Sequence, residues 1–85
     1  MAERQVTVES EVGLHARPAA TFVRTAARAP LEITVAKGDG LPVNAKSILA
    51  VLSLDVRQGD TVVIKAEGEG ADRLLDELAL IASAP

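Results

Sequence analysis

A single histidine, His15, stands beside an arginine where an extended segment gives way to a predicted helix. Its neutral imidazole is a nucleophile near neutral pH. Pro18 suits the first helical turn, where a missing N–H costs no intrahelical bond. The N–H groups of Ala16 and Arg17 are unpaired at such a helix end, and with the Arg17 guanidinium they favour a bound phosphate. This pattern predicts a histidine that accepts a phosphoryl group and has it held by the helix end.

The helix that positions this site is predicted over residues 16–28 and ends near Ala29-Pro30. Apolar side chains recur at helical spacing on one face, while the opposite face is polar and basic. The apolar residues are Ala19, Phe22, Val23 and Ala26, and the solvated ones are Arg17, Thr21, Arg24 and Arg28. A local basic stripe on an acidic protein favours acidic partners.

The other elements follow from alternation and periodicity. Strands are expected over residues 4–9, 31–37, 41–44 and 61–67, and helices over residues 46–54 and 71–83. Gly38-Asp39-Gly40 predicts a hairpin turn, and Pro42 confines the third strand to a sheet edge or a strand end. Because each strand has one apolar face and each helix an apolar stripe, we expect an α+β fold in the order β-α-β-β-α-β-α. The sheet is expected to be antiparallel, with helices covering one side.

Ser47 precedes the short second helix and is a good N-cap candidate, because its hydroxyl can accept a bond from an N–H of the first turn. Ile48, Leu49 and Leu52 make this helix apolar on more than one face. A helix this short cannot bury every face, so we expect part of this set in the core and part exposed.

Composition narrows the function classes for a single domain over residues 1–85. A net charge of −3 and a single aromatic residue argue against nucleic-acid binding. The absence of cysteine and the single histidine argue against a disulfide framework and a metal site, and we expect no cofactor. No apolar run approaches the roughly 20 residues of a membrane span. We therefore expect a cytoplasmic monomer that does not insert into membranes.

The stretch Gly13-Leu14-His15-Ala16-Arg17-Pro18-Ala19 resembles the active-site segment of the HPr family. These are the histidine-containing phosphocarriers of the sugar phosphotransferase system. A second match follows at Lys46-Ser47-Ile48-Leu49-x-Val51-x-x-Leu54, and the resemblance covers Val6 to about Ala82. It implies an open-faced β-sandwich of four strands with three helices on one face. Val12 departs from the family pattern, because many members carry a small polar residue there.

The resemblance also implies a mechanism. His15 would take a phosphoryl group on its pros nitrogen from enzyme I, which receives it from phosphoenolpyruvate, and pass it to enzyme IIA in sugar uptake. Arg17 matches the arginine that clamps the phosphate oxygens. Such a protein is a carrier with a transient phosphohistidine rather than an enzyme with free turnover. The implied partner interface comprises Ala20, Arg24, Ile48, Leu49 and Leu52.

Alternatives stay open for two residues and for the whole chain. His15 is otherwise an exposed histidine that only caps a helix. Ser47 is either a cap alone or the serine phosphorylated by HPr kinase/phosphorylase in many, mostly Gram-positive, lineages. The chain is otherwise a regulatory module that binds partners through the second helix, or a carrier in a nitrogen-related or dihydroxyacetone phosphorelay. His15 and Arg17 together favour a carrier over a regulatory module, and the acceptor stays open.

Overall fold

The computed structural model describes residues 1–14 and 16–84, and in these it has four strands and three helices. The strands are β1 (Ala2–Thr7), β2 (Glu32–Lys37), β3 (Val43–Asn44) and β4 (Thr61–Glu67). The helices are α1 (Ala16–Ala27), α2 (Ile48–Ser53) and α3 (Ala71–Ser83). The element order is the predicted one, and β4 and α3 have the predicted bounds.

Two strand predictions were wrong in their bounds by two residues, and the strand expected over 31–37 begins one residue later, at Glu32. The strand expected over 4–9 is β1, which begins at Ala2 because β4 extends far enough to pair Ala66 with it. It ends at Thr7, which faces Thr61, the first residue of β4. The strand expected over 41–44 keeps only its last two residues, because Pro42 has no N–H to donate to a ladder.

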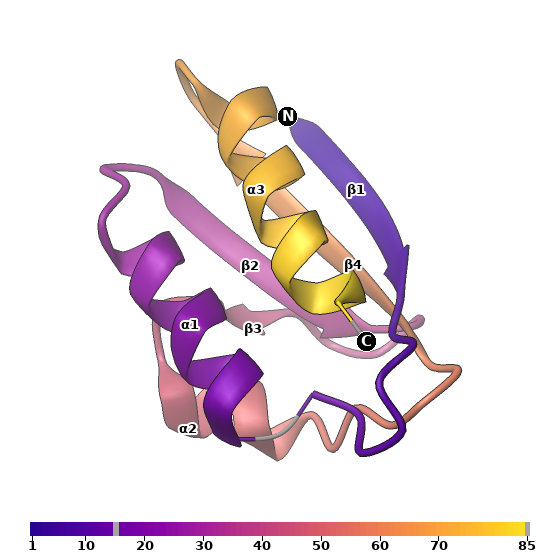
Figure 1. The fold of residues 1–85 in the computed structure, drawn as a ribbon. Coiled ribbons are helices and arrows are strands. Elements are labelled where there is room, and N and C mark those ends of the chain that lie inside the picture. Colours follow the sequence, from indigo (N-terminus) through magenta and orange to yellow (C-terminus); the bar gives the residue numbers. More distant parts are fainter. Residues whose placement is uncertain (15, 85) are drawn as a thin grey trace.

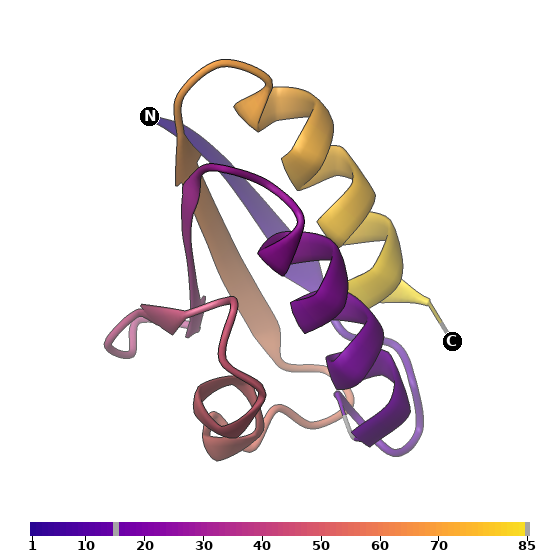
Figure 2. The same cartoon turned by 90° about the vertical axis from the view of Figure 1, so that its left-hand side faces the viewer.

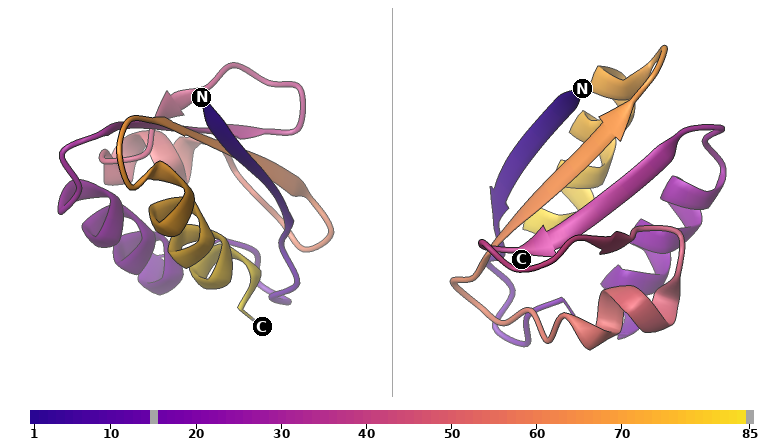
Figure 3. Two further views of the ribbon diagram at one scale, coloured as in Figure 1. Left: turned by 90° about the horizontal axis from the view of Figure 1, so that it is seen from above. Right: turned by 180° about the vertical axis from the view of Figure 1, so that it is seen from behind.

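The sheet is antiparallel throughout, in the order β1-β4-β2-β3. Central β4 pairs on one side with β1 and on the other with β2, and β3 lies at an edge as Pro42 predicts. Helices α1 and α3 lie side by side over one face, with α2 beside α1 (Figure 1). Figure 2 shows the sheet and the helices as two layers, and Figure 3 shows the uncovered face from behind. This is the expected open-faced sandwich.

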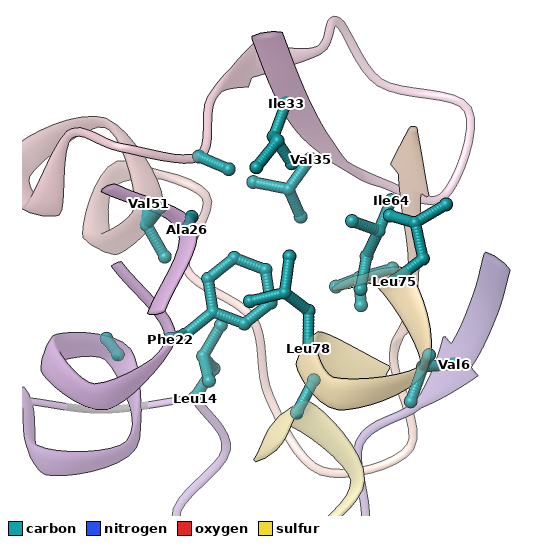
Figure 4. Packing of buried hydrophobic residues seen from close by; sticks show 14 of the residues in the cluster. Val6, Leu14, Phe22, Ala26, Ile33, Val35, Val51, Ile64, Leu75 and Leu78 are labelled. Atoms are coloured by element: carbon teal, nitrogen blue, oxygen red, sulfur yellow. The ribbon is translucent and has the colours of Figure 1, made fainter. Parts of the chain in front are cut away.

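One aliphatic core fills the space between the layers, with Phe22 near its centre (Figure 4). The largest fully buried side chains are Phe22, Ile33, Ile64, Leu75, Leu78, Val8, Val35, Val51 and Val62. Leu14, immediately before the first helix, is also buried and points into this cluster. The segment that leads to α1 is therefore anchored by apolar packing.

The apolar face of α1 differs from the prediction at two positions. Val23 is half-buried, and Thr25 is buried in addition to the apolar residues. In the part of the chain that the structure describes, no helix is long and apolar enough to cross a membrane. No group of three or more His, Cys, Asp or Glu residues within 1–14 and 16–84 could hold a metal ion.

Candidate functional site

The predicted acceptor, His15, lies outside the described residues, and the neighbouring residues define the site. We call residues 8–14 the acceptor loop. Its last residue, Leu14, is buried and donates its N–H to the carbonyl of Val56 at 3.1 Å. Ala16 begins α1 and is exposed, as is Arg17. The chain thus passes from an anchored residue to an exposed helix start.

Gly13 is required by the path of the acceptor loop. Its φ is +72°, in the region that L side chains rarely adopt. A Cβ at this position would clash with the carbonyl oxygen of Val56 and would lie 2.8 Å from the Cα of Arg57. The N–H of Gly13 also donates to the carbonyl of Ser10 at 2.9 Å. Only glycine allows the two segments to approach this closely.

The segment behind Gly13 is a turn over residues 55–60, which we call the supporting turn. It runs alongside the acceptor loop at the lower end of the molecule in Figure 1. Val8 donates its N–H to the carbonyl of Asp60 at 2.9 Å and accepts from the N–H of Gly59 at 2.8 Å. With the bond from Leu14, backbone hydrogen bonds join the two segments at both ends of the acceptor loop.

Charged groups hold the supporting turn together. Lys37 Nζ donates to the carbonyl of Asp55 at 3.0 Å and lies 3.3 Å from Asp60 Oδ2. The same carboxylate accepts the N–H of Arg57 at 2.8 Å. This N–H bond and the Lys37 ammonium hold the pKa of Asp60 below its usual range. Gly59-Asp60 is typical of a turn, but nothing in the sequence predicts the contacts of this turn with Lys37.

Asp55 has a positive φ of 52°, the only such value among the described non-glycine residues. Asp tolerates this conformation better than most residues. Its carboxylate lies 3.0 Å from Arg57 Nη2, and this hydrogen bond raises the pKa of the arginine. Asp55 and Arg57 line a depression of about 470 Å³ that also includes Leu14, Ala16 and the exposed Val12.

The polar face of α1 is exposed as predicted, at Arg17, Thr21 and Arg24. Arg28 follows the helix and is also exposed; its Nη2 lies 3.4 Å from Thr25 Oγ1. A second depression, of about 690 Å³, lies between the start of α1 and the end of α3. It is lined by Ala16, Arg17, Pro18, Thr21, Ile81 and Ala84. Depressions therefore flank the start of α1 on two sides.

Lys46 binds a backbone carbonyl and does not extend the basic face of α1. Its Nζ donates to the carbonyl of Ala29 at 2.7 Å. The ammonium thereby satisfies a carbonyl beyond the end of α1 and links that end to the segment before α2. Lysine is well suited to this position, because cations are favourable near a helix C-terminus.

Ser47 is the N-cap of α2 as predicted, but the helix expected over residues 46–54 spans only Ile48–Ser53. Ser47 Oγ accepts the N–H of Ala50 at 3.2 Å. The apolar set on this helix is divided: Ile48 is half-buried against the core, whereas Leu49 is 78% and Leu52 40% exposed. Ala20 on neighbouring α1 is half-buried. The expectation that a helix this short exposes part of its apolar set is confirmed.

A family model described as "PTS HPr component phosphorylation site" matches residues 2–83. The chain belongs to the HPr family. HPr proteins are phosphocarriers of the phosphotransferase system, and this chain is therefore such a phosphocarrier. The family implies enzyme I and enzyme IIA as partners.

Individual relatives agree with this assignment. The phosphocarrier protein HPr of Streptomyces coelicolor is 51% identical over 79 residues, which are 93% of this chain and 85% of that protein. The HPr-like protein Crh of Bacillus subtilis is 43% identical over 79 residues, 93% of this chain and 92% of Crh. The crystal structure of an HPr from Bacillus anthracis superposes with a TM-score of 0.86 at 41% identity, covering 94% of each chain. The fold of this chain is therefore the HPr fold.

Proposed function

We propose that His15 is the residue of this HPr that carries the phosphoryl group. The observation that supports this is the arrangement on either side of it: an acceptor loop held by Gly13 and Leu14, followed directly by α1 with exposed Arg17. Phosphoryl transfer depends mainly on positioning and charge stabilisation. N–H groups of a first helical turn and a guanidinium supply that stabilisation.

In the proposed cycle, the pros nitrogen of His15 attacks the phosphoryl group of phosphorylated enzyme I. A P–N bond forms on His15 as the bond to the enzyme breaks. The backbone N–H groups of Ala16 and Arg17 and the Arg17 guanidinium hold the phosphate oxygens. A nucleophile on enzyme IIA then takes the phosphoryl group, which leaves His15 free, and sugar uptake consumes it. No cofactor takes part.

The partner interface is proposed to combine charge with exposed apolar area. Arg24 supplies positive charge on α1 beside Ala20, while Leu49 and Leu52 supply the apolar area on α2. Ile48 packs against the core and is half-buried, so only part of its side chain is open to a partner. Enzyme I and enzyme IIA surfaces that are acidic around an apolar centre would complement this arrangement.

The decisive test is phosphorylation by enzyme I with phosphoenolpyruvate, followed by intact mass. We expect the wild type to gain one acid-labile phosphate and His15→Ala to gain none, with both proteins melting cooperatively. A His15→Ala protein that still gains a phosphate would refute the assignment.

Arg17→Ala tests the clamp separately. An exposed arginine contributes little to folding, so the free energy of unfolding should change by under roughly 0.5 kcal/mol. The rate of phosphoryl transfer should fall roughly tenfold or more, because a charged donor to the phosphate is lost. Unchanged transfer kinetics would remove Arg17 from the mechanism.

Phosphorylation of Ser47 is proposed as the regulatory input, with HPr kinase/phosphorylase as the enzyme. Support comes from its place at the N-terminus of α2, directly before Ile48 and exposed Leu49. A phosphate there adds about −1.5 to −2 charges that a helix N-terminus tolerates but an acidic partner does not. The cost should therefore fall on binding rather than on folding.

Ser47→Asp should keep its fold but bind enzyme I more weakly, whereas Ser47→Ala should transfer at the wild-type rate. The alanine variant should lose about 0.5–2 kcal/mol of stability with its cap. Ser53→Asp, at the other end of α2, is the matched charge control. Equal effects of both aspartates, or none of Ser47→Asp at sub-saturating enzyme I, would leave Ser47 as a cap alone.

The identities favour a carrier over a purely regulatory module. Similarity to the Streptomyces coelicolor phosphocarrier, at 51%, exceeds that to the Bacillus subtilis Crh protein, at 43%. The acceptor is a separate question: enzyme IIA in sugar uptake is the proposed one, and a nitrogen-related or dihydroxyacetone relay is the alternative. Transfer from the phosphorylated chain to enzyme IIA domains of each class would decide between them.

A further inference from the structure

We infer that Lys37 and Asp60 are positioning residues for phosphoryl transfer, although they lie away from the acceptor. The pair fixes the supporting turn, and the turn fixes the acceptor loop that presents His15. The inference rests on the proposed role of His15. It assigns to two partly exposed surface charges a function in the reaction.

The first step is the clamp on the turn itself. Lys37 is the last residue of β2, so its backbone is fixed by the sheet. Its Nζ bonds the carbonyl of Asp55 at 3.0 Å and pairs with the carboxylate of Asp60 at 3.3 Å. These are the first and last residues of the supporting turn. One ammonium group therefore holds both ends of the turn against a rigid strand.

The second step lies inside the turn. Asp60 Oδ2 accepts the N–H of Arg57 at 2.8 Å, and the N–H of Asp60 donates to the carbonyl of Arg57 at 3.0 Å. The Asp60 side chain thus bonds both the turn and Lys37. Its exposed fraction is only 32% and that of Lys37 only 38%, so water screens the pair incompletely.

The third step carries the constraint to the acceptor loop. Val56 accepts the N–H of Leu14 at 3.1 Å, and Gln58 Nε2 donates to the carbonyl of Glu9 at 3.2 Å. The acceptor loop cannot move closer to the supporting turn at Gly13, because there is no room even for a Cβ between them. A displacement of the turn must therefore displace the residues that precede His15.

Neither residue lines the depressions beside the start of α1, so the pair acts through the turn and not on the phosphoryl group. Small misplacements of a reacting group reduce rates strongly. Loss of the pair should therefore lower the rate of the transfer step without weakening the docking of enzyme I.

The test uses Asp60→Asn and Lys37→Gln in the full chain. Asparagine keeps an oxygen that can accept the Arg57 N–H, so Asp60→Asn removes the charge that pairs with Lys37 and keeps the hydrogen bond within the turn. Lys65→Gln is the matched control, because Lys65 forms a comparable pair with Glu3, at 3.6 Å, on the uncovered face of the sheet. Lys37→Arg retains the positive charge and should restore part of the function.

Three quantities are measured: the kcat and KM for enzyme I, and the hydrogen-exchange rate of the Leu14 amide. For Asp60→Asn and Lys37→Gln we expect kcat to fall roughly three- to tenfold with KM unchanged. The Leu14 amide should exchange several-fold faster, because its acceptor on the turn becomes mobile. The double variant should be no worse than Lys37→Gln, since that variant already removes the Lys37–Asp60 pair that Asp60→Asn disrupts.

The outcomes separate this inference from the proposed function. If the wild type accepts phosphate but both variants match Lys65→Gln in kcat and in Leu14 exchange, the positioning role is refuted and the carrier role stands. A rise in KM at constant kcat would also refute it, because the pair would then serve docking. If His15 is not the acceptor, either the wild type gains no phosphate in the mass experiment or His15→Ala still gains one, whatever the Leu14 exchange shows.

Discussion

The charged cluster at the supporting turn and the one between β1 and α3 differ in what their side chains bind. At the supporting turn, Lys37 reaches a backbone carbonyl, and Asp60 reaches a backbone N–H. Between β1 and α3, Arg4 pairs with the carboxylates of Asp72 at 3.3 Å and Asp76 at 2.9 Å, and its bond to backbone, at 2.9 Å, reaches only the adjacent Glu3 of the same strand. Those carboxylate side chains are 80% and 67% exposed. A charge bonded to backbone restrains the path of the chain, whereas a charge bonded to an exposed side chain can be replaced by water.

The largest effect is expected where the acceptor loop and the turn touch directly. Gly13→Ala adds a Cβ against the Val56 carbonyl and forces a residue with φ +72°. We expect a loss of about 2–4 kcal/mol in the free energy of unfolding, measured by urea denaturation. Phosphoryl transfer at a temperature where the variant is folded should also be slower, because the loop must shift.

Gly38→Ala provides the control for this prediction. Gly38 also has a positive φ, +54°, but a Cβ there would meet nothing within 4 Å. It should therefore lose only the conformational term of about 1–2 kcal/mol and transfer phosphate normally. Equal losses in the two variants would show that the contact with Val56 has no energetic weight.

A smaller effect on stability is expected when the pH is lowered and Asp60 becomes protonated. The pKa of Asp60 is lowered in the folded state, first by the Arg57 N–H and then by Lys37. Such a group contributes stability above its unfolded pKa, near 3.9, and loses it as the pH falls through the lower folded value. The melting temperatures of the wild type and Asp60→Asn should differ by a few degrees at pH about 7 and converge once the pH has fallen below the folded pKa of Asp60. A difference independent of pH would mean that the carboxylate charge contributes nothing.

The smallest effect is expected at the exposed cluster. Asp76 above all raises the pKa of Arg4, yet both of its carboxylate partners are mostly solvated. Arg4→Gln should lower the melting temperature by roughly one or two degrees, and less at high salt. Its kcat and the exchange of the Leu14 amide should match the wild type. A loss of transfer in Arg4→Gln as large as in Asp60→Asn would abolish the distinction between the clusters.

Most of the fold could be predicted because it follows local periodicity. Alternation gave β4 its bounds, and the apolar stripe of α3 predicted a helix that buries Leu75 and Leu78. One error occurs where a distant segment sets the end of a strand, and another where a proline within the predicted strand removes a donor. The end of β1 is set by where β4 begins, and the strand before Asn44 is shortened by the N–H that Pro42 lacks.

The site divides in the same way. The Ser47 cap depends on a bond to Ala50, within the reach of local pattern, and it was predicted. Lys37 and Asp60 are far apart in sequence, and their spacing gives no sign that Lys37 contacts both Asp55 and Asp60. The bond of Lys46 to Ala29 was missed for the same reason. The roles of His15 and Arg17 follow from the helix-end pattern together with the family resemblance, and they stay predictions.

The strand order has a consequence for how the protein is made. The central strand, β4, is the last strand to leave the ribosome, and the first strand needs it: Ala2 pairs with Ala66. Until residue 67 has emerged, β1 and β2 have no strand between them, and the apolar face of α1 has only part of its partner surface. Long loops must close before these pairings form, which slows folding. The nascent chain should therefore collapse late and in one step, and chaperones that shield apolar surface would meet it before the sheet is complete.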